Sequence, residues 1–219
     1  MLKNVNRILI IKLRDIGDIV LSTPVIQTMY ENCNSPKIVY VLKKEYENFK
    51  YLLPDVSEVI TYDKKSLLSF ITLIFRLRRY KFDIAINLHA TFRSALMARL
   101  SGAKLRLVHN HSGKDWFTSV PLGIKEEAKP ITLRDLETLK PLAIKMPPLN
   151  SIKTKLTIKE KDIKYIDDRL DANTAGFGIG AKRPAKMWKT ANFIELGKKL
   201  TEKKMKIAVF ASSSEREQG

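Results

Sequence analysis

Short apolar runs alternate with longer segments of helical spacing along the first half of the chain. The short runs are rich in Ile, Val and Leu and contain few polar residues, which is typical of strands buried on both faces. They comprise residues 7–13, 37–44, 58–63, 82–89 and 104–109. Strands of this kind predict a parallel sheet.

The segments between these runs have the length and the apolar spacing of helices. They comprise residues 18–32, 45–53, 66–80 and 92–102. Strands joined by helices through short connections and right-handed crossovers form a doubly wound, Rossmann-like layer of the α/β class. The helix at 66–80 has an apolar face wide enough to be mostly buried, and Gly102 marks the C-terminal stop of the next helix.

The strand–helix pattern loosens after residue 110 and resumes near residue 158. A helix is predicted at 133–144, and two adjacent prolines mark residues 146–157 as a linker. Beyond the linker, helices alternate with strands: 159–170, 176–181, 192–204 and 205–211. We therefore predict a Rossmann-like N-terminal domain at 1–145 and the start of a second such domain at 158–219. Two strands and two helices are too few for a complete domain, so the second is expected to be truncated.

Two loops follow carboxyl ends of strands, which is where parallel sheets bind their ligands. The first, RDIGD, carries Asp15 and Asp18, and the second is NLHATFR. The alternatives for each aspartate are a functional carboxylate and a helix cap. Pro24 is tolerated only near a helix start, so the regular helix is predicted to begin near Ser22, with Ser22 as its N-cap. Asp18 would then lie in an irregular segment before the helix.

Glycine-rich nucleotide-binding motifs are not found in these loops. RDIGD has one glycine, so it is neither a dinucleotide-binding fingerprint nor a P-loop. GFGIGA at 176–181 has three alternate glycines, but they follow a helix and do not form a strand–turn–helix phosphate cradle. The sequence therefore argues against a dehydrogenase.

A strong excess of positive charge narrows the choice of partners. Lys and Arg number 40 against 23 acidic residues, which gives a formal net charge of +17. This balance favours nucleic acid, an anionic membrane surface or phosphorylated small molecules, or else it reflects lysine-rich solvated helix faces. Because the basic residues are spread over several clusters along the chain, both interpretations stay open.

Cysteine usage and hydropathy bear on location. Cys33 is the single cysteine, which excludes an internal disulfide and favours a reducing compartment. No apolar run reaches the roughly 18–20 residues of a membrane-spanning helix. The N-terminal apolar run is too short for a signal peptide. The sequence therefore predicts a cytoplasmic protein whose contact with a membrane is at most peripheral.

Three segments resemble a known family. RILIIKLRDIGDIVLSTPVIQTMY (7–30) is similar to the N-terminal signature of glycosyltransferase family 9, the lipopolysaccharide heptosyltransferases. That signature has a short strand, a basic residue, Gly-Asp-hydrophobic, and Pro six residues after the Asp. NLHATFRSALMARLSGAKLRL (87–107) resembles the family's Arg-Ser helix and following basic strand. GIGAKRPAKMWKTANFIELGKKL (178–200) resembles the Lys-x-Trp segment that opens its C-terminal domain.

The resemblance implies a GT-B fold, with two Rossmann-like domains. The first would bind the acceptor, a lipid A–core oligosaccharide, and the second would bind the donor, ADP-heptose. Transfer would invert the anomeric configuration and would need neither a metal nor another cofactor. Asp18 matches the family's proposed general base, and Lys186 matches the Lys-x-Trp lysine suited to the donor diphosphate. Lys12, His89 and Arg93 match positions near the acceptor. Such an enzyme would act in the cytoplasm, peripherally at the inner face of the inner membrane.

The chemistry fits these residue types, although each has a plainer interpretation. Inverting transfer needs one base for the acceptor hydroxyl, and a metal-free leaving diphosphate needs positive charge. An arginine fork suits the phosphates of the inner core. The alternatives are a solvated lysine for Lys186, a surface residue for Arg93, a satisfied structural histidine for His89 and a packing role for Trp188.

Other conspicuous side chains lie near residue 110. Trp116 and Phe117, close to Lys114, form either an apolar, cationic lip for the lipid-bearing acceptor or membrane, or packing beneath the loop. His109 and His111 have no metal-ligand spacing. They are predicted to lie in a loop.

The sequence departs from the family in three ways. PITLRDL lacks the histidine that commonly precedes this helix, Asp15 occupies a position that usually carries a small residue, and the later Gly- and Asp-containing donor loop is absent. The alternatives to heptosyl transfer are a related family-9 transferase with another nucleotide-sugar donor and a non-catalytic, truncated polyanion-binding module. Binding of nucleic acid is not expected, because basic strands interleaved with aromatic residues are not seen.

Overall fold

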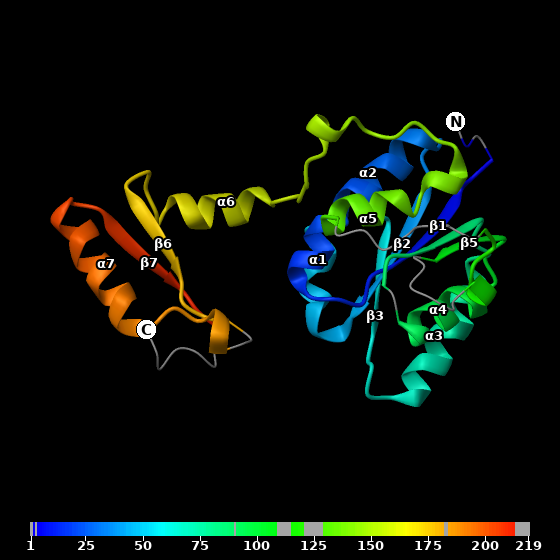
Figure 1. Cartoon of the computed structure of the whole chain (residues 1–219), viewed down its shortest axis with the longest axis horizontal. Helices are drawn as coiled ribbons and strands as arrows, with labels where there is room; N and C mark the ends of the chain where they lie inside the picture. Colours follow the sequence, from blue (N-terminus) through cyan, green and yellow to red (C-terminus); the bar gives the residue numbers. More distant parts are fainter. Residues whose placement is uncertain are drawn as a thin grey trace. The chain divides into compact units, whose positions relative to one another are not determined.

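The computed structural model describes residues 2, 4–89, 91–108, 115–120, 129–181 and 184–212 (Figure 1). The chain divides into two compact units, Met1–Thr157 and Ile158–Gly219. The first unit contains a five-stranded, fully parallel sheet in the order β3-β2-β1-β4-β5. Its strands are β1 (Arg7–Ile11), β2 (Lys37–Lys43), β3 (Glu58–Tyr62), β4 (Ile84–Asn87) and β5 (Leu105–Val108). The predicted α/β class and parallel sheet are confirmed.

Both faces of this sheet are buried, because apolar residues follow one another along the strands. In β1, Ile8 and Ile10 belong to one core cluster, and Leu9 and Ile11 belong to the other. Each of these side chains is 0% exposed and stabilises the fold by about 1.5–3 kcal/mol. The first face is covered by α1 (Ile16–Leu21), α2 (Thr23–Asn32) and α5 (Ile131–Glu137), and the second by α3 (Leu67–Arg79) and α4 (Phe92–Leu100).

Shorter helical segments complete the first unit. These 3-10 helices are η1 (Lys44–Tyr51), η2 (Asp115–Phe117), η3 (Lys140–Leu142) and η4 (Leu149–Ser151). Cys33 ends α2 and is 8% exposed. Burial raises the pKa of its thiol.

The helical region after β1 differs from the prediction. It forms two short helices, because the chain breaks at Ser22 and α2 starts afresh with Pro24 in its first turn. Asp18 therefore lies in the first turn of α1 and not in an irregular segment. Ser22 occupies the N-cap position of α2, but its hydroxyl donates to the Ile19 carbonyl at 2.7 Å and bonds the Tyr40 hydroxyl at 2.6 Å.

The prediction that the helix at 66–80 is mostly buried is wrong. One side of α3 packs into the core through Leu73, Ile74 and Leu77. Four other large apolar side chains are exposed: Leu67 at 74%, Leu68 at 70%, Ile71 at 44% and Phe75 at 66%. The physical reason is that α3 covers the side of the sheet that ends at the edge strand β3. A single sheet face can bury only one side of a helix.

The second unit has a two-stranded parallel sheet. Its elements are α6 (Glu160–Asp167), β6 (Thr174–Gly178), η5 (Pro184–Lys186), α7 (Thr190–Glu202) and β7 (Lys206–Phe210). Before it, the segment at 146–157 runs along the first unit, where the Thr157 amide donates to the Leu52 carbonyl at 2.8 Å. Among the described residues, no helix has both the length and the apolar character that crossing a bilayer requires.

Candidate functional site

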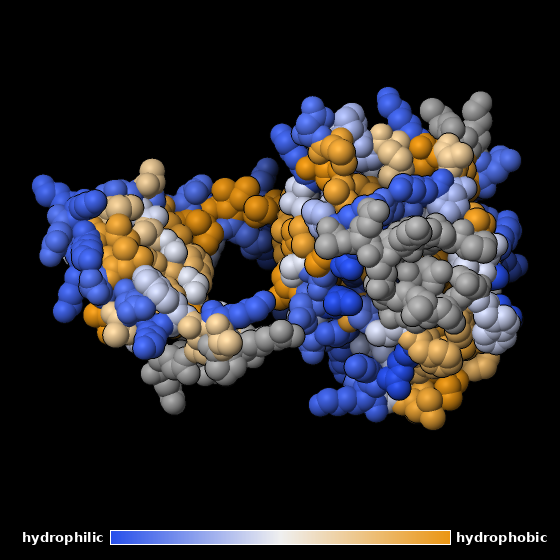
Figure 2. Space-filling model, viewed as in Figure 1, coloured by the Kyte–Doolittle hydropathy of each residue, from blue (hydrophilic) through white to orange (hydrophobic). Residues whose placement is uncertain are grey.

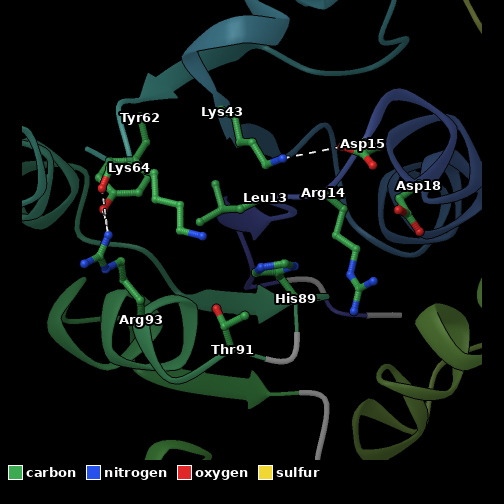
Figure 3. A pocket seen from close by; sticks show the side chains of 10 residues that line it. All are labelled: Leu13, Arg14, Asp15, Asp18, Lys43, Tyr62, Lys64, His89, Thr91 and Arg93. Carbon is green, nitrogen blue, oxygen red and sulfur yellow. Dashed lines mark hydrogen bonds and ion pairs between the residues drawn. The ribbon is translucent and has the colours of Figure 1, made fainter. Parts of the chain in front are cut away.

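A pocket of about 400 Å³ lies at the carboxyl ends of strands β1 to β4 (Figure 3). The two loops singled out from the sequence meet here, since RDIGD and NLHATFR both contribute side chains. The lining residues are Leu13, Arg14, Asp15, Asp18, Lys43, Tyr62, Lys64, His89, Thr91 and Arg93. The pocket is therefore where ligands are expected in an open parallel sheet.

The carboxylate of Asp18 is free to act on a ligand. The residue is half-buried in the first turn of α1 and lines the pocket. Within the described part of the chain, its carboxylate makes neither a hydrogen bond nor an ion pair. A partly shielded carboxylate without a partner can accept a hydrogen bond, or a proton, from a bound hydroxyl group.

Asp15, three residues earlier, is instead held by neighbouring side chains. Its Oδ1 accepts a hydrogen bond from the Tyr46 hydroxyl at 2.9 Å and lies 3.5 Å from Lys43 Nζ. Lys43 is also 3.3 Å from Glu45. Asp15 occupies the N-cap position of α1, but its side chain makes no capping hydrogen bond. The structure thus gives the two aspartates different surroundings.

Positive charge dominates the pocket wall. Arg14, Lys43, Lys64 and Arg93 all line it. Arg93 lies across the pocket from Asp18, and its Nη1 donates to the Tyr62 hydroxyl at 3.1 Å and the Lys64 carbonyl at 2.8 Å (Figure 3). These bonds orient the guanidinium, so the wall is prepared for an anionic group such as a phosphate.

Three of these cations were missed by the sequence reasoning. Arg14, Lys43 and Lys64 each stand at or just after the carboxyl end of a strand: β1, β2 and β3. A signal for them was present, because every such strand end in a parallel sheet contributes to the same edge. Attention to basic residues at strand ends would have found them.

His89 is neutral at physiological pH. Burial, and then the charges of Arg14, Lys12, Lys43 and Lys64, lower the pKa of its imidazole from 6.5 to about 4. Its Nδ1 is buried without a hydrogen-bond partner among the described residues. The interpretation of His89 as a satisfied structural histidine is therefore wrong for this atom, which is available to a ligand.

We expect the imidazole of His89 to titrate near pH 4 in an NMR experiment that follows its ring protons. The protonated form is disfavoured in the fold, so the stability linked to this group is complete above pH 6.5. It is lost as the pH falls from 6.5 towards 4. Arg14→Ala should raise this pKa by removing a nearby positive charge, whereas Arg169→Ala in the second unit should leave it unchanged. A His89→Gln spectrum assigns the signal, and a wild-type pKa near 6.5 would contradict the proposed environment.

Lys12, which the resemblance implies to be near the acceptor, does not line the pocket. Its side chain is 2% exposed, and its Nζ lies 2.5 Å from Asp135 Oδ2 on α5. Burial raises the pKa of Asp135 to about 6, although the neighbouring charges of Lys12 and Arg134 lower it. The charge of Asp18 raises this pKa as burial does. Lys12 thus ties the end of β1 to α5.

Lys186 belongs to the second unit and is exposed at the end of η5. Trp188 nearby packs edge-on against Phe193, with ring centroids 4.9 Å apart, which confirms its predicted packing role. Both aromatic residues line an apolar cavity of about 240 Å³.

The two aromatic residues near residue 116 differ in burial. Phe117 is buried, but Trp116 is 67% exposed, and the guanidinium of Arg99 stacks on its ring at 4.2 Å. His109, His111 and Lys114 lie outside the described residues. Within the described ranges, no group of three or more His, Cys, Asp or Glu side chains is arranged to hold a metal ion.

Comparison with known proteins gives consistent matches. A model of glycosyltransferase family 9 (heptosyltransferase) matches residues 70–219. The solved glycosyl transferase family 9 protein from Veillonella parvula DSM 2008 is similar with a TM-score of 0.82, at 22% identity over 99% of this chain. E. coli ADP-heptose lps heptosyltransferase II is similar with a TM-score of 0.80, at 21% identity over 97% of this chain. E. coli heptosyltransferase WaaC, solved with ADP-2-deoxy-2-fluoro heptose, is similar with a TM-score of 0.75, at 16% identity over 97% of this chain.

This chain covers only part of each of the three solved chains. This chain spans 65%, 66% and 71% of the lengths of those three solved chains. A comparison with curated proteins found no match. At identities of 16–22% the likeness to solved structures is one of fold, and it confirms the predicted GT-B type.

Proposed function

Because this chain belongs to glycosyltransferase family 9, the heptosyltransferase family, we propose that it transfers heptose from ADP-heptose to a sugar of the lipopolysaccharide core. The observation that carries the proposal is the carboxylate of Asp18, which has no partner among the described residues and lies at a cationic pocket on the carboxyl edge of the sheet. Transfer proceeds with inversion and needs no metal ion. It takes place in the cytoplasm, at the inner face of the inner membrane, where the enzyme is bound peripherally.

Asp18 is the general base in this proposal. Its carboxylate takes the proton of the acceptor hydroxyl as the hydroxyl oxygen bonds to the anomeric carbon of the donor sugar. The bond between that carbon and the diphosphate oxygen breaks on the opposite face, so ADP leaves and the anomeric configuration inverts. One positioned carboxylate is sufficient for this step, which agrees with the engagement of Asp15 by Tyr46 and Lys43.

The acceptor is bound by the pocket wall. Arg93 pairs with a phosphate of the phosphorylated inner core through its oriented guanidinium. His89 offers to a sugar hydroxyl its Nδ1, which has no partner in the described part of the chain. Lys12 contributes indirectly, because it is buried against Asp135 and holds the end of β1, next to the pocket, in place.

The donor is bound by the second unit. Lys186, exposed at the end of η5, neutralises the diphosphate of ADP-heptose as negative charge develops on it. Support for this donor comes from a relative, since E. coli heptosyltransferase WaaC has been solved with ADP-2-deoxy-2-fluoro heptose and with ADP.

The proposal is tested by incubating the protein with a lipid A–core acceptor and a panel of nucleotide sugars. We expect ADP release with ADP-heptose above the other donors, unchanged by EDTA, and a product whose anomeric configuration, read by NMR, is opposite to that of the donor. Preference for another nucleotide sugar would point instead to a related family-9 transferase, and a retained configuration would exclude the single-base mechanism.

A further inference from the structure

The exposed side of α3 presents a continuous apolar stripe. Leu67, Leu68, Ile71 and Phe75 are 44–74% exposed, and at 3.6 residues per turn they fall within an arc of about 100° of the helix surface. Figure 2 shows hydrophobic surface gathered over the region of the first unit where α3 lies. The adjoining side of the helix is packed in the core through Leu73, Ile74 and Leu77, so this stripe is not needed to hold the unit together.

Unpaired positive charge stands at both ends of the stripe. Lys64 and Lys65 precede the helix, and Arg78 and Arg79 end it. Within the residues that the structure describes, none of these four side chains has an acidic partner, whereas Arg76 on another side of the helix is bonded to Glu58 at 2.7 Å. We call the four apolar residues and these four cations the α3 face.

We propose that the α3 face docks on an anionic bilayer surface and so brings the pocket to its lipid-borne acceptor; this inference rests on the proposed function. The apolar stripe lies in the boundary between headgroups and acyl chains, and the cations contact anionic headgroups. An exposed apolar strip flanked by basic side chains is the pattern of a helix that lies in the plane of a membrane interface.

Charge complementarity favours a bilayer over a second copy of the chain. Two α3 faces placed together would bring like charges into contact, in a chain whose net charge is already +17. Anionic headgroups complement the same charges. A partner without negative charge would leave the four cations unpaired.

The α3 face lies next to the pocket, because one residue belongs to both. Lys64 belongs to both, because it lines the pocket and also precedes the first turn of α3. Arg93, on the pocket wall, donates to the Lys64 carbonyl. Docking of α3 therefore holds the acceptor-binding edge of the sheet next to the headgroup layer, where the core sugars of a lipid-linked acceptor lie.

The test is co-sedimentation of the protein with phosphatidylcholine vesicles, made with and without phosphatidylglycerol. We expect binding that requires phosphatidylglycerol and weakens with salt. Leu68→Ser with Phe75→Ser should lower the partition coefficient about tenfold or more, as should Arg78→Glu with Arg79→Glu. The matched controls are exposed positions of the second unit, Ile163→Ser with Ile166→Ser and Lys198→Glu with Lys203→Glu, which should bind nearly as the wild type does.

Further measurements separate docking from folding and from catalysis. Circular dichroism and thermal melting should show the α3 variants folded, and these variants should retain transfer to a lipid-free core oligosaccharide. Asp18→Asn should lose transfer but bind vesicles as the wild type does, so failure of the proposed function and failure of docking are distinguishable. Equal vesicle binding by the α3 variants and the wild type would overturn the proposal. A wild-type dimer in ultracentrifugation that the α3 variants abolish would also overturn it, by identifying a second copy as the occupant.

Discussion

Replacing Asp18 with asparagine is expected to lower the rate of heptosyl transfer by about 10²- to 10⁴-fold, the usual contribution of a positioned general base. Asparagine keeps the size of the side chain but cannot accept the proton of the acceptor hydroxyl. The fold should be unaffected, because the carboxylate has no partner among the described residues. The measurement is kcat from ADP release, together with a thermal melt to show that the variant is folded.

Asp15→Asn is the matched control, on the same loop and with the same chemical change. It weakens the bond from Tyr46 and the contact with Lys43. Because Asp15 is exposed, with a side chain 56% accessible, we expect a loss of stability of no more than about 1 kcal/mol. Transfer should fall far less than with Asp18→Asn. Equal losses in the two variants would mean that the carboxylates act as a pair or that Asp15 is the base.

Removal of either partner of the Lys12–Asp135 pair should destabilise the first unit by about 3–5 kcal/mol. The two side chains are 2% and 4% exposed, and their charged atoms are 2.5 Å apart. Lys12→Met leaves a buried carboxylate without its cation, and Asp135→Leu leaves a buried ammonium without its anion. Urea unfolding followed by circular dichroism measures the change in free energy.

The double variant distinguishes the pair from ordinary packing. Lys12→Met with Asp135→Leu removes both charges at once, so it should be considerably more stable than either single variant. Lys50→Met serves as the exposed control, since Lys50 and Glu47 are 3.8 Å apart and 37% and 54% accessible. Because Lys50 is exposed to solvent, this variant should leave the free energy of unfolding nearly unchanged. Additive losses in the double variant would show that the two charges do not depend on each other.

Much of the fold of the first unit could be predicted, because the pattern that indicates each strand lies within the residues of that strand. Continuous apolar runs such as RILII in β1 indicate strands buried on both faces, and each strand end then indicates the binding edge. That is why Asp18, His89 and Arg93 could be placed at one edge of the sheet from the sequence.

The burial and pairing of Lys12 could not be predicted from the local sequence pattern. Its side chain pairs with Asp135, 123 residues further along the chain, and no spacing rule connects the two positions. Sequence resemblance placed a basic residue near the acceptor, but burial decides whether the charge reaches the pocket or is neutralised behind it.

The exposed stripe of α3 was mispredicted for a different reason. Apolar spacing reports that a helix has a wide apolar arc, and it does not report how much neighbouring structure covers that arc. Leu73 and Leu77 meet the sheet, whereas Leu68 and Phe75 do not. On a helix packed at an edge strand, the excess apolar arc points to a surface role.

The burial of Cys33 has a practical consequence for experiments on this protein. Alkylating reagents attack the thiolate, and burial both raises the pKa of this thiol and shields it. Since the chain has no other cysteine, a maleimide dye will react with a newly introduced surface cysteine and leave Cys33 unmodified. The protein therefore behaves as a cysteine-free background for site-specific labelling, and its core need not be altered to create one.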